Sequence, residues 1–563
     1  MVSFLRWMVL VMLGTLSLTA CAPLSPPPAA ASVGPQTTLP DAYDIGNPTL
    51  SELYVAPTGA DTNPGTSATQ PLRTLTEAWA RVPLTPSTTG YRINLLPGVY
   101  PCEPGEPDAC NNFFSDRTGT YAFPVIIRAL NGPGSVTLRG GLNLRKVQYL
   151  YLLDLTLVGG GVLPTNSAGN NLLHLDASSH VLLRGLQARG PDCPTDACNN
   201  LQEVLKVNQT DYLYVEGSEF GGAWHSTVDY FAVQYGHFLR NRLYTAGQWC
   251  MYVKGGSAYL RIAGNELFGC QLGFQAGQAA NLAMMRAPWL HYEAYDIKFV
   301  NNLLHDLPGV GLSVAGGYNI LLAYNTLYRV GTDTNTGYGL VQLVHGERNC
   351  TPTDELPDPA PNCRAFANLG GWGPTAYSES LPAIPNRNVF VANNLAYNPA
   401  PGRTLYTHFS LAGPIAPPAG FANVPNPTST DDNLVFTGNL IWNGPPEHPL
   451  GVEAACLPSN PTCNETRIRA DNTLNTVEPR LASPDCGDYH LDASSLAVPN
   501  TTMPPSFPAW GPFTPVVPDG TLTNQVTDDY LGLTRGATSP PGAYATRMLA
   551  YGCTKRFLPT VTR

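Results

Sequence analysis

One short pattern occurs six times between residues 238 and 442: an alternating apolar strand, an asparagine, and then further apolar or aromatic residues. The six copies read FLRNRLY, IAGNELF, FVNNLLH, LAYNTLY, VANNLAY and FTGNLIW, and their shared asparagines are Asn241, Asn265, Asn302, Asn325, Asn394 and Asn439. The spacings of 24, 37, 23, 69 and 45 residues suit the coils of a solenoid interrupted by insertions. Asparagine tolerates a left-handed bend between two strands, and stacked asparagines can pair their side-chain amides. The pattern therefore predicts stacked β-strand coils.

The first residues predict an export signal. Arg6 precedes an apolar run over residues 7–18 that is too short to cross a membrane. The sequence LTAC at residues 18–21 resembles a bacterial lipobox, which implies a signal peptide over 1–20, a lipid on Cys21 and a flexible tether over 21–49. We expect an exported protein, anchored by lipid alone at the bacterial cell surface or outer membrane, although which membrane holds the lipid stays open. The alternative is an ordinary signal peptide.

Cysteine usage fits an exported chain. Removing Cys21 from the 13 cysteines leaves 12, an even number. Cys250 and Cys270 are 20 residues apart, about one coil, so they are expected to join adjacent coils. The other predicted pairs are Cys102 with Cys110, Cys193 with Cys198, Cys350 with Cys363, Cys456 with Cys463, and Cys486 with Cys553. A metal site is the alternative, but no Cys-x-x-Cys or Cys-His cluster has ligand spacing, so no metal site is predicted.

Composition limits the architecture and the partners. A solenoid grows along one axis, so 563 residues are compatible with one long domain, which we place at residues 50–500 with a packed tail over 501–563. Only 13% of residues are charged, and Gly and Pro number 54 each, which is typical of strands and turns. With 31 Lys and Arg against 41 Asp and Glu, the chain lacks the basic surface that a nucleic-acid partner requires. We expect a monomer.

Both ends of the chain resemble one group of proteins. Residues 53–83 and 93–100 are similar to the opening of bacterial right-handed parallel β-helix proteins, and residues 477–498 and 528–545 are similar to their closing segments. The resemblance implies an all-β, right-handed parallel β-helix of the pectate-lyase-like superfamily over about residues 50–550. Leu72, Leu75, Ala78, Trp79 and Val82 fall on one helical face and are expected to cap the N-terminal end of the core. The superfamily includes lyases, glycosidases and adhesins, so the fold alone does not give a function.

Four middle coils close a strand with similar phrases, MYVKGG, LGFQAG, LSVAGG and LVQLVHG. Aligning them on their final glycines predicts that Lys254, Gln275, Ala315 and His345 stack on the outer face of one sheet. Two insertions, at residues 278–295 and 347–387, leave the solenoid at this corner. They are expected to form the walls of a cleft.

The first insertion carries aromatic and titratable residues. We interpret Gln275, Gln278, Trp289, Tyr292 and Glu293 as substrate-binding residues, because aromatic rings pack on sugars and polar groups orient them. His291, with His345, is a candidate catalytic residue. The alternatives are that Trp289 and Tyr292 only pack the insertion onto the coil, and that His291 is a structural hydrogen-bonding residue.

Lys254 is the main catalytic candidate, since a lysine among packed apolar neighbours can lose its charge near neutral pH and act as a base. The segment KGGSAYLRIAGNELF from Lys254 resembles the catalytic lysine region of the chondroitinase B and alginate lyase family. That resemblance implies β-elimination with lysine as base, arginine as acid and calcium bound to the uronate. Gln275 stands where the arginine is expected, and Gly247 and Trp249 stand where acidic calcium ligands are expected, so calcium stays open and no cofactor is certain. The alternative is an exposed lysine.

Hydrolysis is a weaker possibility. A glycosidase needs two carboxylates across a cleft, and the spacing of Asp229, Glu266 and Glu293 singles out no pair. We therefore predict a surface-anchored protein that binds polysaccharide and cleaves it by lyase-type β-elimination. The alternative is a non-catalytic cell-envelope or adhesion protein whose disulfides staple its loops.

Overall fold

The computed structural model describes residues 41–101, 111–159, 171–190, 201–333, 339–349, 370–373, 383–399, 408–417, 423–452, 464–495, 498–499, 501–511 and 516–550. Residues 42–563 belong to one compact unit. The predicted signal peptide, Cys21 and most of the tether lie outside the described residues.

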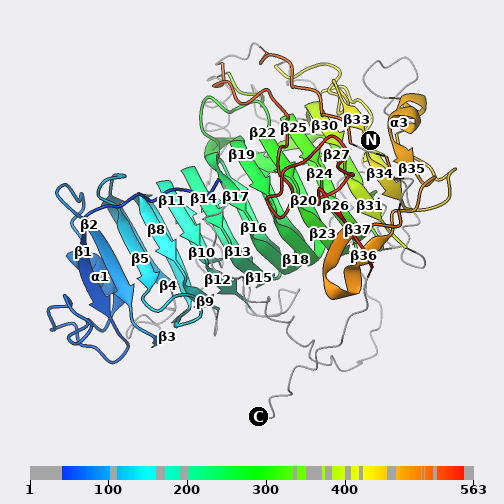
Figure 1. The fold of residues 1–563 in the computed structure, drawn as a ribbon. Coiled ribbons are helices and arrows are strands. Elements are labelled where there is room, and N and C mark those ends of the chain that lie inside the picture. The colour runs from blue at the N-terminus through cyan, green and yellow to red at the C-terminus, as the bar shows by residue number, and fades with distance from the viewer. Residues whose placement is uncertain are drawn as a thin grey trace, which may run out of the picture. The chain divides into compact units, whose positions relative to one another are not determined.

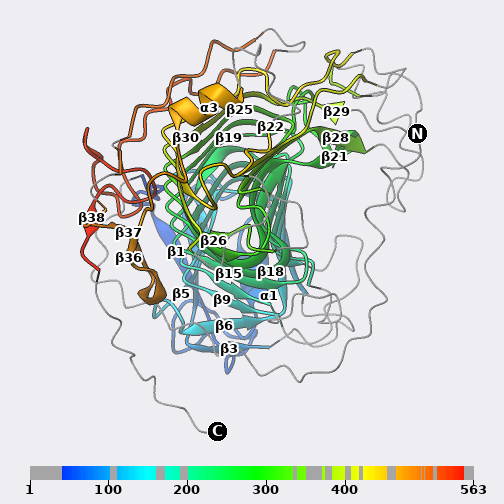
Figure 2. The same cartoon turned by 90° about the vertical axis from the view of Figure 1, so that its right-hand side faces the viewer.

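The described strands of this unit wind as a right-handed parallel β-helix, as the sequence predicts. Each strand pairs in parallel with the equivalent strand of the next coil. For example, β14 (Asp211–Glu216) pairs with β17 (Gln234–Leu239), with Asp211 opposite Gln234. Figure 1 shows the coils following one another in chain order, and Figure 2 views them end on. Residues far apart in sequence therefore become neighbours on one face.

Three sheets make up the coils, and we name them the site sheet, the second sheet and the third sheet. The site sheet holds β4 (Asn111–Thr118), β7 (Gly141–Gln148), β10 (Asn171–Asp176), β13 (Glu203–Asn208), β16 (Ser226–Phe231), the ends of β18 (Arg242–Lys254) and β20 (Glu266–Gly277), β24 (Leu312–Ala315), β27 (Val341–Val344) and β32 (Phe409–Leu411).

The second sheet follows the site sheet in each coil. It holds β1 (Leu50–Val55), β2 (Gly90–Leu95), β5 (Val125–Ala129), β8 (Leu150–Leu153), β11 (Ser179–Arg184), β14, β17, β19 (Ser257–Ala263), β22 (Ala294–Val300), β25 (Gly317–Ala323), β30 (Arg387–Ala392) and β33 (Val435–Thr437).

The third sheet completes the coil. It holds β3 (Gly98–Tyr100), β6 (Val136–Arg139), β9 (Thr156–Val158), β12 (Gln187–Arg189), β15 (Glu219–Ala223), the starts of β18 and β20, β23 (Leu303–Leu307), β26 (Thr326–Val330), β31 (Leu395–Tyr397), β34 (Leu440–Trp442) and β35 (Thr473–Leu474).

A short helix, α1 (Leu75–Arg81), lies at the N-terminal end of the core, as predicted. Its five expected apolar residues are all buried in the cluster that fills the solenoid: Leu72, Leu75, Ala78, Trp79 and Val82. Thr74 caps the helix, because its hydroxyl accepts a hydrogen bond from the Glu77 amide. The helix thus shields apolar side chains that the first coil leaves without a neighbour.

The six repeat asparagines form one continuous buried ladder. Each side-chain amide donates to the side-chain oxygen of the next, at 2.9–3.2 Å, from Asn241 to Asn439. Asn439 extends the ladder to Asn472 at 2.8 Å, which follows helix α3 (Glu465–Asp471). The predicted stacking of the asparagines is confirmed.

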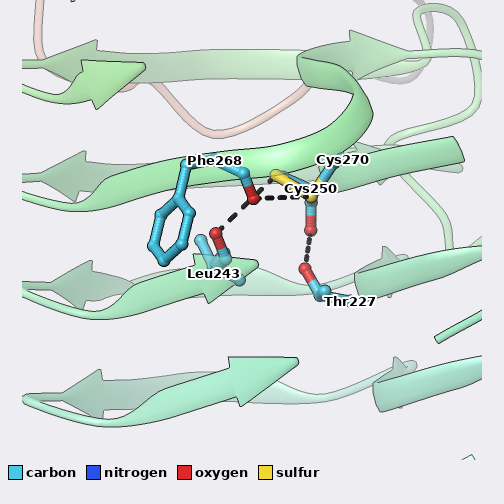
Figure 3. Close-up of a disulfide and its surroundings, with 5 residues drawn as sticks. All are labelled: Thr227, Leu243, Cys250, Phe268 and Cys270. Atoms are coloured by element: carbon cyan, nitrogen blue, oxygen red, sulfur yellow. Dashed lines mark hydrogen bonds between the residues drawn. A yellow bond between two sulfur atoms is a disulfide. The ribbon is translucent and has the colours of Figure 1, made fainter. Parts of the chain in front are cut away.

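Cys250 and Cys270 are joined by a disulfide between β18 and β20 on neighbouring coils, with their Cα atoms 5.5 Å apart, as predicted (Figure 3). The Thr227 hydroxyl donates to the Cys250 carbonyl from the coil before. Cys486 is also disulfide-bonded, but its predicted partner Cys553 lies outside the described residues. The same holds for Cys102, Cys110, Cys193, Cys198, Cys350, Cys363, Cys456 and Cys463.

The ends of the described chain pack on the outside of the solenoid. Tyr43, which we expected in the flexible tether, stacks on Tyr214 with 4.2 Å between ring centroids, and its amide donates to Glu216. Near the C-terminus, β36 (Leu481–Ser483), β37 (Asp488–Asp492) and β38 (Arg547–Met548) form a separate small sheet. Among the described residues, no helix has the length and apolar character needed to span a bilayer.

Candidate functional site

The outward-facing positions of the site sheet form a row of polar side chains that we call the polar stripe. Strand register places one such residue on each of eight successive coils. In chain order they are Asn143, His174, Lys206, Asp229, Tyr252, Gln275, Ser313 and Gln342. The residues between these positions point into the core, since side chains alternate along a strand.

Asp229 lies near the middle of the polar stripe, and it is buried, with only 1% of its surface exposed. Lys206, from the coil before, forms an ion pair with Asp229 Oδ2. The Tyr252 hydroxyl, from the coil after, donates to the same oxygen at 2.8 Å. Lys254 Nζ is 3.8 Å from this oxygen and 3.4 Å from the Tyr252 hydroxyl. Two lysines therefore share one carboxylate.

The pKa values of the two lysines move in opposite directions. Burial alone would raise the pKa of Asp229, but the charges of Lys206 and Lys254 outweigh it and lower that pKa. Burial would also lower the pKa of Lys206, yet the close Asp229 and Glu203 carboxylates raise it. For Lys254, burial is the largest effect, and together with the positive charge of Lys206 it outweighs the Asp229 and Glu203 carboxylates, so its pKa is lowered. Lys206 thus holds its proton more tightly than an ordinary lysine, and Lys254 holds its own less tightly.

The rest of the Lys254 surroundings is mixed. Its ammonium donates to Gln278 Oε1 at 3.2 Å, so these two predicted site residues are in contact. Its nitrogen lies 4.4 Å from the Tyr252 ring centroid and 5.9 Å from that of Phe231. Phe231 belongs to an apolar cluster with Leu282 and other residues of the first insertion. The insertion therefore keeps water from one side of the lysine.

Hydrogen bonds extend the polar stripe in both directions from this centre. His174 contacts Asn143 Oδ1 at 3.0 Å and Asn208 Nδ2 at 3.1 Å. On the other side, the Ser313 hydroxyl donates to Gln275 at 3.0 Å and to Gln342 at 3.4 Å. Among the predicted substrate-binding residues, Gln275 is thus part of the stripe, one coil after Tyr252.

Two members of the predicted ladder are out of register. Val253 is opposite Ala276, so Lys254 faces Gly277, and Gly277 in turn is opposite Ala315. The prediction that Gln275 stands directly above Lys254 is wrong, because Gln275 is opposite Tyr252. His345 also lies outside the ladder: Val344 is opposite Ala315, and the His345 ring contacts the Thr428 carbonyl at 3.2 Å.

The two insertions meet beside the site sheet. A small sheet joins β21 (Ala279–Asn281) of the first insertion to β28 (Gly346–Asn349), which pairs with β29 (Ala383–Ile384). Behind this sheet the carboxylate of Glu293 forms a fully buried ion pair with Arg348. It also accepts from the Gly255 amide at 3.0 Å. Glu293, predicted to bind substrate, instead fixes the corner that follows Lys254.

Three other predicted residues lie past this corner, against the second sheet. Trp289 Nε1 donates to the Tyr259 hydroxyl of β19 at 3.1 Å, and Tyr292 packs on Tyr318 of β25. His291 is 4% exposed, and burial first, then the Arg348 charge, lower its pKa to about 4. The structure does not bring these three side chains onto the Lys254 face. Their contacts match the alternatives of a packed insertion and a structural histidine.

The carboxylates considered for hydrolysis do not face one another. Asp229 is on the site sheet, and Glu266 is on the third sheet, where His305 and Arg242 bind it. Glu293 is the buried partner of Arg348. No group of three His, Cys, Asp or Glu side chains among the described residues is arranged to hold a metal ion.

Comparisons with known proteins come from structure alone. No protein-family profile matches the sequence, and no curated protein matches it. A rhamnogalacturonan lyase is similar over 68% of this chain and 87% of its own, with 12% identity and a TM-score of 0.43. The pectate lyase Pel9A is similar over 89% of this chain and 97% of its own chain, with 13% identity and a TM-score of 0.43.

A surface adhesin, PfbA of Streptococcus pneumoniae, is similar over 55% of this chain and 73% of its own, with 9% identity and a TM-score of 0.35. At these identities the similarity concerns the fold alone. The fold and register described above define this chain as a right-handed parallel β-helix protein.

Proposed function

We propose that this protein binds an acidic polysaccharide along the polar stripe and cleaves it by β-elimination, with Lys254 as the base. One observation supports the proposal above all others. Lys206 and Lys254 share the Asp229 carboxylate, and only Lys254 has a lowered pKa. A base must be unprotonated near the working pH, and a lysine reaches that state only when its surroundings penalise its charge.

Charge supports an acidic substrate. Of the five lysines in the chain, two stand at this one carboxylate. Asp229 and the nearby Glu203 carboxylate balance the two ammonium groups when both lysines are protonated, so the attraction for a substrate carboxylate is local to the ammonium groups and is not a net charge of the cluster. Lys206, held protonated by Asp229, then keeps a positive charge in the site while Lys254 is neutral.

The length of the polar stripe supports a polymer as the ligand. It runs over eight coils, and with a strand spacing of about 4.8 Å it extends over roughly 34 Å. A chain of several sugar units laid along the solenoid axis would match this length and would contact the partly exposed members of the stripe, Asn143, His174, Lys206 and Gln342, whereas Asp229, Tyr252, Gln275 and Ser313 are at most 5% exposed. Small molecules would use only one or two of these positions.

The proposed reaction needs one proton acceptor and a bond that breaks. Neutral Lys254 Nζ takes the proton from the carbon next to the uronate carboxylate. The electron pair of that C–H bond becomes the new C=C bond, the glycosidic C–O bond breaks, and the departing oxygen takes a proton from water. We place this activity outside the cell, and the only basis for this location is the predicted export signal and the predicted lipid at Cys21.

The test is formation of the unsaturated product, measured by ultraviolet absorbance with polygalacturonate and alginate, with and without calcium. We expect product from the wild type and at least about a hundredfold less from Lys254→Ala, since a lost general base costs about 10²–10⁴ in rate. Lys146→Ala is the matched control, because Lys146 is an exposed lysine on β7 outside the cluster. No product from the wild type, or equal rates from Lys254→Ala, would contradict the reaction; binding without product would favour a non-catalytic envelope protein.

A further inference from the structure

At or near the start of the second-sheet strand, each of nine successive coils carries a residue with positive φ. On the first five coils this residue is aromatic, and on the last four it is Asp or Asn. The nine residues are Tyr149, His180, Tyr212, Tyr235, Tyr259, Asp296, Asn319, Asn388 and Asn433, with φ between 45° and 62°. Ala177, Gln209 and Ala232 in the same corners have positive φ as well.

The two halves of this row differ in what their backbone conformation costs. Asn and Asp visit the left-handed region readily, whereas a bulky residue there is a true outlier. The last four coils therefore use the residue types that the conformation favours. Four of the first five coils instead place a tyrosine there, a less favourable choice, although the same chain shows that Asn fits the position; His180 is of a type that this region favours.

Contacts within the chain account for the Asp and Asn half. Asn388 donates to Asn319 at 2.7 Å, and Asn433 donates to Asn388 at 2.7 Å. Asp296 accepts from the Thr521 amide at 2.6 Å, so the C-terminal segment covers this part of the corner. The segment also contacts Tyr259, whose hydroxyl donates to the Pro518 carbonyl, and Tyr235 packs edge to face on Trp289, with ring centroids 6.5 Å apart.

The other four rings, Tyr149, His180, Tyr212 and Tyr235, form what we call the aromatic stripe. Successive ring centroids are 4.3, 4.5 and 5.0 Å apart, and the planes are within 20° of parallel. Because each inner ring has its faces covered by its neighbours, the stripe presents ring edges and hydroxyl groups to a ligand rather than open faces.

The tyrosine hydroxyls of the aromatic stripe form no hydrogen bonds with the described part of the chain. Those of Tyr149, Tyr212 and Tyr235 have no hydrogen-bond partner among the described residues, in contrast to that of Tyr259. Tyr212 is 38% exposed. The aromatic stripe therefore carries three phenol hydroxyls without a partner in the described part of the chain, and Tyr212 is the most exposed of the three tyrosines.

The aromatic stripe is electrically neutral. Burial lowers the pKa of His180, so its ring is uncharged near neutral pH. Asp211, the charged residue before Tyr212, is held by Arg286 in two hydrogen bonds of 2.7 and 2.8 Å. A ligand that complements this surface is uncharged, rich in hydroxyl groups and extended along the solenoid axis.

We infer that the aromatic stripe, Tyr149, His180, Tyr212 and Tyr235, is a second glycan-binding surface that takes an uncharged stretch of a polysaccharide chain. It lies one corner away from the polar stripe and runs along the same coils: Tyr235 follows Phe231, the neighbour of Lys254, by four residues. This surface is separate from the cleavage chemistry and does not depend on it. It would hold neutral polymer while the polar stripe engages acidic units.

The experiment is affinity electrophoresis of the full chain in native gels that contain soluble xylan, galactan or mixed-linkage glucan, with polygalacturonate as a further arm. We expect at least one neutral polymer to retard the wild type. Tyr212→Asn installs the residue type of the later coils, which the backbone accepts, and should weaken binding about tenfold, the loss of about 1.4 kcal/mol. Tyr121→Asn is the control, because Tyr121 is a 46% exposed tyrosine outside the stripe.

Three outcomes overturn the inference: no neutral polymer retards the wild type, Tyr212→Asn binds as the wild type does, or light scattering shows a dimer that Tyr212→Asn dissociates. The last result would identify the stripe as a contact between two copies of the chain. Lys254→Ala should bind the neutral polymers as the wild type does. Failure of the cleavage test and failure of this binding test are therefore distinguishable.

Discussion

Glu293 shows at the scale of one residue how burial changes the role expected from sequence. Its side chain and that of Arg348 are both 0% exposed, and they form an ion pair. The Arg348 guanidinium also donates to the His291 carbonyl at 2.5 Å. The carboxylate holds the Gly255 amide, next to Lys254. Glu293 therefore acts on the site by positioning, through the backbone that carries the lysine.

Replacing Glu293 by Gln should destabilise the protein strongly. The change leaves the Arg348 charge buried without its partner, which costs about 3–5 kcal/mol. Urea unfolding followed by circular dichroism measures the loss. Glu347→Gln is the matched control. Glu347 is next to Arg348 on β28 and is exposed, so this substitution should change the free energy of unfolding by about 0.5 kcal/mol or less. Equal effects of the two substitutions would show that the buried pair is not what holds this corner.

The polar stripe was partly readable from the sequence. Lys206, Asp229, Tyr252 and Gln275 are each 23 residues apart, which is the length of an uninterrupted coil, so this period could have placed Lys206 and Asp229 beside Tyr252, two residues before Lys254. Aligning phrases on their closing glycines hid it. A glycine marks where the chain turns, whereas the register of paired strands depends on the pleat. Lys254 precedes Gly256 by two positions, and Gln275 precedes Gly277 by two positions, yet Gln275 is opposite Tyr252 and not opposite Lys254.

Among the elements, the asparagine ladder was the most predictable from sequence. Each ladder asparagine uses both ends of its side chain: Asn302 Oδ1 accepts from the Asn265 amide at 2.9 Å, and Asn302 Nδ2 donates to the Ile262 carbonyl at 3.1 Å. A buried backbone group needs such a partner, so the residue type recurs wherever the bend recurs. The predicted disulfide between Cys250 and Cys270 follows from the same regular coil length. The insertions follow no such period, and their packing was not predictable.

Replacing Asn302 by Ala should open the ladder in its middle. The change leaves the Asn265 amide and the Ile262 carbonyl without partners in the interior, at about 1–3 kcal/mol for each group. Hydrogen exchange measured by mass spectrometry should show faster exchange in peptides that contain Asn265. Asn472→Ala, at the partly exposed end of the ladder, should cost less. Similar exchange in both variants would mean that the coils, not the ladder, determine local stability.

For the whole molecule, the titration of buried histidines sets the response to acid. His408 is 0% exposed; its burial, followed by the charges of His448 and Arg469, lowers its pKa to about 3. His291 has a pKa of about 4 for similar reasons. His305 moves the other way: burial would lower its pKa, but hydrogen bonds to Asp306 and Glu266 outweigh burial and raise it.

The sign of the pH dependence follows from these shifts. Between about pH 6.5 and pH 4 the unfolded chain binds protons at His291 and His408 that the folded chain excludes, so stability falls as the pH falls. From about pH 7 to about pH 5 each of the two contributes a loss of about 2 kcal/mol. His305 opposes this trend, because its raised pKa adds stability as the pH falls through that pKa and loses it as the pH rises.

Urea unfolding at a series of pH values should therefore give a stability that decreases between about pH 6.5 and pH 4, and His408→Gln should flatten that slope by about one proton. Glutamine can still accept hydrogen bonds from Asn475, which contacts His408 Nε2 at 3.0 Å, but it cannot be protonated. His305→Gln should instead make the loss of stability in acid steeper, since it removes the histidine that gains a proton on folding. If His408→Gln keeps the slope of the wild type, the acid response comes from carboxylates such as Glu216 and not from His408. Burial would raise the pKa of Glu216, but hydrogen bonds from His237 and Tyr43 and the charge of Arg184 outweigh burial and lower that pKa.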